Sequence, residues 1–248
     1  MSIYSSLLTA KKAGEKSFAI LIDPDRVKLE DIDLLVELAA KAQVDYFLVG
    51  GSLIVNNSLD HCLHAIKQRC SIPLILFPGD SYQLSYRADG ILLLSLISGR
   101  NAELLIGKHV IAAPYLKTSP LEVISCGYIL IDGGVSTTVS YMSNTTPIPA
   151  TKTDIAVCTA LAGEMLGMKL VYLEAGSGAR NPVSAEMIDE VSNAVQIPLI
   201  VGGGIDTPER ALMNVQAGAD VVVVGNAVEK DPHLIEEIAD AVHSVSPV

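Results

Sequence analysis

The chain has 248 residues, 50% of them hydrophobic, and a formal net charge of −11 at pH 7. This acidic balance argues against a protein that follows a nucleic-acid backbone or docks tightly on anionic lipid, because both need clustered Lys and Arg. No apolar run approaches the ~20 residues of a membrane-spanning helix, and the four cysteines lack C-x-x-C or zinc-site spacing, so we expect a soluble, cytoplasmic protein with reduced thiols.

Short apolar runs alternate with helical patterns along the whole chain. This alternation is typical of βα units and a parallel sheet, whose strands are apolar throughout because both faces are covered. Eight such runs in a chain of about 250 residues predict one (β/α)₈ TIM barrel that forms a single domain over residues 1–248. The expected strands are Phe18–Asp23, Tyr46–Val49, Pro73–Phe77, Gly90–Leu94, Tyr128–Ile131, Leu170–Glu174, Leu199–Val201 and Val221–Val224.

Helical spacing between these runs predicts the outer ring. Ser184 begins a partial capping box in which Met187 replaces the acidic partner, and Thr207 before Pro208 is a strong helix start. A polar loop is expected over 136–153. The expected helices are Glu30–Gln43, Ser58–Gln68, Asn101–Gly107, Asp154–Leu166, Ser184–Val195, Thr207–Ala217 and a last helix that opens at Asp231-Pro232.

The third helix of the ring is missing from the pattern. Residues Pro78–Asp89, between the third and fourth expected strands, are too short and too rich in Pro, Gly, Asp and Ser for a full helix with a loop on each side. We predict that a loop or one short turn replaces this helix and opens a side route into the mouth of the barrel. The alternative is a short helix without functional meaning.

Glycine-rich loops follow each of the last three expected strands. In a TIM barrel the carboxyl ends of the strands form the active-site face, so these loops are expected on one rim. Glycine lets backbone N–H groups approach and hold an anion without a charged side chain. One such loop could be only a tight turn, but three on adjacent strands predict a phosphate site. The loops are Glu174–Ala179, Gly202–Ile205 and Gly225-Asn226.

The first two strands end in oxygen-bearing side chains. Asp23-Pro24-Asp25 follows the first strand and Gly50-Gly51-Ser52 the second. A carboxylate and a hydroxyl at this face suit Mg²⁺, which takes few protein ligands and fills its shell with phosphate and water. Spacing alone leaves the alternatives open: Asp23 as a turn residue and Ser52 as the N-cap of a short helix.

Tyr172 and Glu174 point to the same side of the sixth strand, because side chains i and i+2 share a face. Glu174 adjoins the phosphate loop, where its carboxylate could act as a general base or orient a hydroxyl. The alternative is a structural carboxylate that pairs with Arg180 or caps a loop. Lys169 precedes this strand and should lie at the opposite end, which weighs against an aldolase.

Together these motifs resemble the geranylgeranylglyceryl phosphate synthase family, which includes the bacterial heptaprenylglyceryl phosphate synthases. The missing third helix also matches that family. The Tyr-Leu-Glu-Ala-Gly-Ser-Gly-Ala string is the most specific motif, whereas the last two segments are shared with many phosphate-binding barrels. The resemblance runs through Leu21–Asp25, Gly50–Ser52, Tyr172–Ala179, Gly202–Ile205 and Val224–Asn226.

The resemblance implies Mg²⁺-dependent transfer of a geranylgeranyl or other long prenyl group from prenyl diphosphate to the sn-3 hydroxyl of sn-glycerol 1-phosphate, in ether-lipid synthesis. Asp23 and Ser52 would bind Mg²⁺, with assistance from Asp25. Glu174 and Tyr172 would be catalytic, with Glu174 taking or holding the hydroxyl proton. The glycerol phosphate would be bound by Tyr172, Leu173, Glu174, Ala175, Gly176, Ser177, Gly178, Gly203, Gly204, Gly225 and Asn226.

The same resemblance implies an apolar groove, a homo-oligomer and peripheral contact with a membrane for product release. There are two departures from the family pattern. Leu94–Leu105 lacks a Trp, which leaves the prenyl length open, and Leu21 stands where some members carry a lysine, which indicates the branch of the family that differs in diphosphate contacts and often forms higher oligomers. The C20 donor is favoured by resemblance alone. Two other functions stay open at this point: a phosphosugar isomerase or lyase on the same barrel, and a non-catalytic barrel that binds a phosphorylated ligand.

Overall fold

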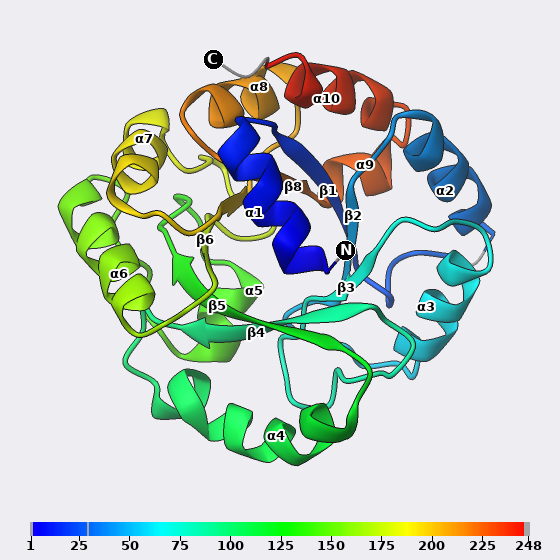
Figure 1. Ribbon diagram of the computed structural model, residues 1–248, viewed down its shortest axis with the longest axis horizontal. Helices are drawn as coiled ribbons and strands as arrows, with labels where there is room; N and C mark the ends of the chain where they lie inside the picture. Colours follow the sequence, from blue (N-terminus) through cyan, green and yellow to red (C-terminus); the bar gives the residue numbers. More distant parts are fainter. Residues whose placement is uncertain (1, 29, 246–248) are drawn as a thin grey trace.

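Eight parallel strands close into a barrel in the computed structural model, which describes residues 2–28 and 30–245 (Figure 1). The strands pair in chain order, and β8 returns to pair with β1. The predicted TIM barrel is thereby confirmed. Met1, Leu29 and residues 246–248, which belong to the predicted domain, lie outside the described residues.

The strands agree closely with the predicted runs, and three of them agree to the residue. The main difference is β5, which begins six residues earlier than predicted, at Glu122. The Glu122 carboxylate accepts hydrogen bonds from the backbone N–H groups of Ile3 and Tyr4, at 2.6 and 3.0 Å. The strands are β1 (Ser17–Ile22), β2 (Tyr46–Val49), β3 (Leu74–Leu76), β4 (Gly90–Leu96), β5 (Glu122–Leu130), β6 (Leu170–Glu174), β7 (Leu199–Gly202) and β8 (Val221–Val224).

The helices form an outer ring around the barrel (Figure 1). Both predicted starts are present, since the hydroxyls of Ser184 and Thr207 accept from the backbone three residues on. No helix of the described residues is long and apolar enough to cross a membrane. The helices are α1 (Ile3–Ala13), α2 (Ile32–Lys41), α3 (Leu59–Lys67), α4 (Lys108–Thr118), α5 (Thr138–Ser143), α6 (Thr153–Met165), α7 (Ala185–Ala194), α8 (Pro208–Gln216), α9 (Asn226–Lys230) and α10 (Leu234–His243).

Three helical predictions were wrong in extent. The helix expected to end at Gly107 starts with a π-helical turn, η1 (Glu103–Gly107), and continues as α4, which accommodates Pro114 within it. The loop expected over 136–153 contains α5, whose first turn is capped by Thr137. The short α9 follows β8 directly and was not predicted. Glycine, proline and short polar runs interrupt the helical pattern in all three places.

Between β3 and β4, residues 77–89 form only turns and loops, so the third helix is replaced as predicted (Figure 1). The ladder between these two strands is correspondingly short, with Ile75 opposite Gly90 and Leu76 opposite Ile91. The end of the barrel formed by the amino ends of the strands is covered by α1, which crosses the centre of the barrel in Figure 1. An ion pair at 2.8 Å joins Lys11 of α1 to Asp220, the residue before β8.

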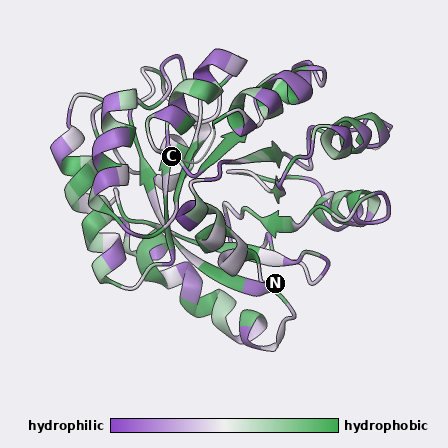
Figure 2. Ribbon diagram, turned by 45° about the horizontal axis from the view of Figure 1, so that its top comes forward, coloured by the Kyte–Doolittle hydropathy of each residue, from purple (hydrophilic) through white to green (hydrophobic). Residues whose placement is uncertain are grey.

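The apolar side chains form one layer between strands and helices and another inside the barrel. Figure 2 shows the hydrophobic strands enclosed by helices whose outer faces are largely hydrophilic. Near the carboxyl ends of the strands, three aromatic rings fill the interior. Tyr172 lies 5.4 Å from both Phe77 and Tyr128, measured between ring centroids. These rings pack together inside the barrel, directly beneath the rim that carries the predicted site.

Candidate active site

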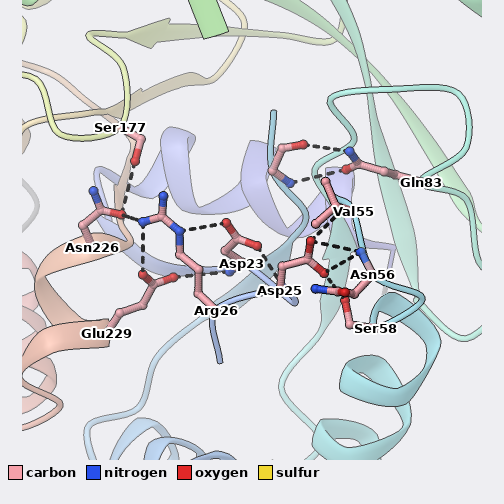
Figure 3. Close-up of polar contacts among 11 residues, drawn as sticks. Asp23, Asp25, Arg26, Val55, Asn56, Ser58, Gln83, Ser177, Asn226 and Glu229 are labelled. Atoms are coloured by element: carbon pink, nitrogen blue, oxygen red, sulfur yellow. Dashed lines mark hydrogen bonds and ion pairs between the residues drawn. The ribbon is translucent and has the colours of Figure 1, made fainter. Parts of the chain in front are cut away.

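The structure brings the three glycine-rich loops together on one rim. The Ser177 hydroxyl, from the loop after β6, donates to Asn226 Oδ1, from the loop after β8, at 3.2 Å (Figure 3). Gly203, after β7, has φ +86°, and a Cβ built on it would lie 2.4 Å from Glu174 Oε1 and 2.6 Å from the Gly176 nitrogen. Only glycine fits between the Glu174 carboxylate and the Gly176 nitrogen. The Gly176 N–H donates to Glu174 and the Ala175 N–H to the Gly202 carbonyl, so an anion would be held by the other N–H groups of these loops.

Glu174 ends β6 as a buried carboxylate. Burial raises its pKa to about 7, although the Gly176 N–H, which donates to Oε1 at 2.6 Å, and the Tyr172 hydroxyl act to lower it. Of the structural alternative, the loop cap is present in this bond from Gly176, whereas no ion pair joins Glu174 to Arg180 in the described part of the chain. A carboxylate with a pKa near neutrality can accept a proton at physiological pH and release it again.

Tyr172 lies on the same side of β6, fully buried, with its hydroxyl so close to Gly202 that a Cβ there would be 2.3 Å away. Within the described residues this hydroxyl has no partner with good hydrogen-bond geometry, yet its proximity affects the pKa of Glu174. A buried hydroxyl without a partner is costly. The Tyr172 hydroxyl lowers the pKa of the Glu174 carboxylate, so it is placed to interact with that carboxylate or with a ligand beside it.

Asp23 follows β1, which pairs with β8, so it lies next to the Gly225-Asn226 loop on the rim. Its Oδ1 accepts from the Asp25 N–H at 3.0 Å, and its Oδ2 lies 3.2 Å from Arg26 Nε. Burial raises its pKa, and the Asp25 N–H and Arg26 oppose that effect. A Cβ built on Gly51 would be 3.6 Å from Asp23 Oδ2, so the carboxylate faces the backbone beside Ser52.

The chemistry of this half of the rim fits Mg²⁺. One carboxylate and one hydroxyl are typical of sites in which substrate phosphates and water complete the shell. No group of three or more His, Cys, Asp or Glu side chains able to hold a metal occurs in the part of the chain that the structure describes. The binding of Mg²⁺ by Asp23 and Ser52, together with a phosphorylated ligand, stays a prediction with which this donor set is compatible.

Asp25 holds the loop that follows β2, and its assistance at the metal stays a prediction. Its carboxylate accepts from the Val55 N–H and the Ser58 hydroxyl, both at 2.6 Å, and from the Asn56 N–H at 3.3 Å (Figure 3). Burial would raise its pKa, but these donors outweigh it and lower the pKa. Asp25 thus fastens the loop between β2 and α3.

Arg26 and Glu229 connect the two halves of the rim, and neither was identified from the sequence. Arg26 NH1 donates to Asn226 Oδ1 at 3.4 Å and lies 4.0 Å from Glu229 Oε2 (Figure 3). Glu229 Oε1 accepts from the Asp23 N–H at 3.4 Å. No local motif marks these residues, because the contacts join segments about 200 residues apart.

A cavity of about 360 Å³ opens beside Ser52 and crosses the barrel wall where the third helix is missing. Its inner part is lined by Phe77 and Leu96, from the layer inside the barrel. Its outer part is lined by Ile91 and Ala112, from the layer beneath the helices. The predicted side route is therefore present as an apolar groove.

Few polar groups line this groove. An ion pair between Asp80 and Lys108 joins the segment after β3 to α4. His109 is half-buried beside them and contacts the Ser95 hydroxyl through Nε2 at 3.1 Å; burial lowers its pKa. On the other side, Met142 of α5 contributes to the wall. The sequence did not identify Asp80, Lys108, His109 or Met142 as lining residues, since they belong to helices that were mispredicted or to a loop without a motif.

Known proteins resemble this chain over nearly its whole length. The model of the PcrB family matches residues 11–245. A geranylgeranylglyceryl phosphate synthase of Chitinophaga pinensis is 58% identical over 246 residues, which cover 99% of this chain and 98% of the relative. One of Spirosoma linguale is 54% identical over 232 residues, covering 94% and 93%.

A solved structure agrees in fold as well as in sequence. The (S)-3-O-geranylgeranylglyceryl phosphate synthase from Thermoplasma acidophilum, in complex with substrate sn-glycerol-1-phosphate, superposes with a TM-score of 0.93. It is 33% identical and covers 99% of this chain and 100% of its own.

Proposed function

The chain belongs to the PcrB family, and from this membership we propose that it transfers a long prenyl group from prenyl diphosphate to the sn-3 hydroxyl of sn-glycerol 1-phosphate. The names of its relatives support the prenyl transfer, and the ligand of the Thermoplasma enzyme supports the acceptor. The geometry of the rim supports the same reaction, because it offers a place for the acceptor phosphate, the acceptor hydroxyl and the prenyl diphosphate.

The phosphate of the acceptor would bind at the glycine-rich loops after β6, β7 and β8. These loops can surround a dianion with backbone N–H groups, which explains how a chain with a net charge of −11 could bind it. Ser177 and Asn226 already contact each other across this part of the rim. With the phosphate there, the glycerol hydroxyls would lie toward Glu174 and Tyr172.

Glu174 would be the general base, and Tyr172 would orient the acceptor through its free hydroxyl. The carboxylate takes the proton from the sn-3 hydroxyl, the hydroxyl oxygen forms a bond to C1 of the prenyl chain, and the bond from C1 to the diphosphate breaks with its electron pair. The deprotonated form is well populated at neutral pH because burial raises the pKa only to about 7.

The diphosphate would lie at Asp23 and Ser52, beside the mouth of the groove. Mg²⁺, when bound there, would neutralise the charge that develops on the leaving diphosphate. The groove would hold the prenyl chain and keep the reacting allylic carbon away from water, since both its inner and its outer part are lined mainly by apolar side chains. Geranylgeranyl diphosphate is the proposed donor by the names of the relatives.

The single observation that carries this proposal is the neighbourhood of Glu174. A buried carboxylate contacts the glycine-rich loops, and one strand away Tyr128 lines the apolar groove. A phosphosugar enzyme would need the loops but not the groove.

The test is an assay of the purified protein with labelled sn-glycerol 1-phosphate and prenyl diphosphates of several lengths, with and without a chelator. We expect a prenyl ether product that requires the metal, with one donor length preferred. Conversion of a phosphosugar without any prenyl donor would favour an isomerase or lyase. Binding of the phosphate without turnover would favour a non-catalytic barrel.

Three further properties remain predictions: a cytoplasmic location, peripheral contact with a membrane for product release and a homo-oligomer. The last is supported by exposed apolar side chains on the outer helices, namely Val110 and Ile111 on α4 and Met165 at the end of α6, which are 64%, 66% and 82% exposed. Measurement of the mass in solution by light scattering tests it.

A further inference from the structure

The segment that replaces the third helix carries a buried side-chain amide, Gln83, which is only 5% exposed. Its Oε1 accepts from the Gly51 N–H at 3.3 Å and from the Gly79 N–H at 3.1 Å. Its Nε2 donates to the Gly51 carbonyl at 2.8 Å (Figure 3). One side chain thus holds both the N–H and the C=O of Gly51, the residue before Ser52.

The backbone of the segment that carries Gln83 packs closely against the backbone that precedes Ser52. A Cβ built on Gly79 would lie 2.4 Å from the Gly51 carbonyl oxygen and 2.7 Å from the Ser52 Cα. A Cβ built on Gly50, whose φ is +151°, would lie 2.1 Å from the Phe77 carbonyl oxygen. Residues 77–83 therefore lie directly against residues 50–52, at a distance that side chains would not permit.

We propose that Gln83 is a positioning residue: it fixes the peptide at Gly51 and so holds the Ser52 hydroxyl at the distance from Asp23 that a shared metal ion requires. This inference rests on the proposed metal–diphosphate site. The missing helix then has a second consequence besides the groove, because the segment that replaces it supports the metal-binding loop.

The need for such support follows from the loop itself. The three residues after Ser52 form no regular structure before Asn56, and Asp25 fastens the loop only from Val55 onward. Gln83 fastens it on the other side of Ser52, at Gly51. A metal with two protein ligands depends on such outer contacts, and loss of one typically weakens metal affinity by about 10–100-fold.

The experiment uses Gln83→Met, which keeps most of the side-chain volume but removes all three hydrogen bonds to Gly51 and Gly79. Mn²⁺ with inorganic pyrophosphate is the probe, and the loss of the free Mn²⁺ signal in electron paramagnetic resonance reports binding. We expect Mn²⁺ affinity in the presence of pyrophosphate to fall by about 10–100-fold. Affinity for sn-glycerol 1-phosphate, measured by calorimetry on the same sample, should change little, which also shows that the barrel is folded.

Two further variants keep the test decisive. Ser85→Ala is the matched control: Ser85 is 3% exposed, lies on the same segment and hydrogen-bonds to Asp60, and among the described residues it has no hydrogen bond to Gly51 or Ser52. It should leave Mn²⁺ binding close to that of the wild type. In Gly79→Ala, the added methyl group would clash with the Gly51 carbonyl and push the segment away from it. This variant should also lose Mn²⁺ affinity, and it serves as the test if Gln83→Met does not fold.

The role of Gln83 is overturned if Gln83→Met and Gly79→Ala bind Mn²⁺ and pyrophosphate as tightly as the wild type, or if Ser85→Ala loses as much affinity as they do. These outcomes leave the proposed function intact when the wild type still forms the prenyl product. A wild type that neither forms the product nor binds Mn²⁺ with pyrophosphate overturns the proposed function, and the role of Gln83 with it.

Discussion

The two parts of the rim that we propose to bind the substrates are built differently. The half formed by β6, β7 and β8 presents backbone N–H groups from loops that pack on one another through glycines such as Gly203. The half formed by β1 and β2 presents the side chains of Asp23 and Ser52 on a loop that Asp25 and Gln83 hold from outside. The glycine-rich loops are positioned by packing on one another, whereas the loop that carries Ser52 is positioned by hydrogen bonds to Asp25 and Gln83.

This difference predicts separable defects. Changes in the side-chain half should impair use of the metal and the diphosphate, and changes in the backbone half should impair binding of the glycerol phosphate. Glu174, at the end of β6 in the backbone half, should affect the chemical step itself.

Glu174→Gln should have the largest effect, because it removes the base and keeps the shape of the side chain. We expect turnover to fall by about 10²–10⁴-fold, while affinity for sn-glycerol 1-phosphate, measured by calorimetry, changes little. Turnover close to that of the wild type would remove Glu174 from the reaction.

Asp23→Asn should come next. Loss of the carboxylate removes the charged ligand that would hold Mg²⁺, so turnover at ordinary Mg²⁺ should fall by at least ~100-fold. A titration with Mg²⁺ should show partial recovery at high concentration, with unchanged binding of the glycerol phosphate. Wild-type activity that is indifferent to a chelator would contradict the metal role and the division between the two halves.

The pH dependence should follow Glu174. Because its pKa is about 7 and the carboxylate is the active form, the rate should fall about tenfold per unit as pH drops below 7. The raised pKa also means that the folded state binds this proton more tightly than the unfolded chain, so stability should decline as pH rises from about 4.5 to about 7. Denaturant unfolding of wild type and Glu174→Gln across this window checks the sign: the variant should lack this decline.

Gly203→Ala tests the backbone half. Its φ of +86° and the 2.4 Å approach of the new Cβ to Glu174 Oε1 should displace the loop and weaken binding of sn-glycerol 1-phosphate by about tenfold or more. Gly167→Ala is the matched control, since Gly167 has φ +83° but open space around its Cβ position. It should cost some stability and leave binding unchanged; equal losses in both variants would point to backbone strain alone.

Tyr172→Phe should have the smallest effect. It removes one hydroxyl that lacks a good partner in the protein, so the free energy of unfolding should stay the same or rise. Binding of the glycerol phosphate should weaken by about 2–10-fold if the hydroxyl donates to that ligand. Unchanged binding, measured by calorimetry, would show that Tyr172 serves only to pack beneath the rim.

Much of the backbone half could be predicted from the sequence, because its requirements are local. A loop that needs positive φ at Gly176, Gly178, Gly203 and Gly204 must carry glycine there, and such glycines are visible in the sequence. The order of eight apolar runs likewise determined the barrel, because covered parallel strands are apolar on both faces. The absent third helix was visible as a segment too short and too broken to form one.

Only the tertiary structure decided how the side-chain half is held. Arg26 meets Asn226 across 200 residues, and Gln83 meets Gly51 across 32, because closing the barrel brings these segments side by side. The sequence could place Asp25 on the correct rim, but its hydrogen bond from Val55 depends on where the β2–α3 loop packs. Each residue's φ preference determines the local backbone conformation, so it can be predicted from the sequence. A contact between distant segments forms only when the folded barrel brings the two segments together.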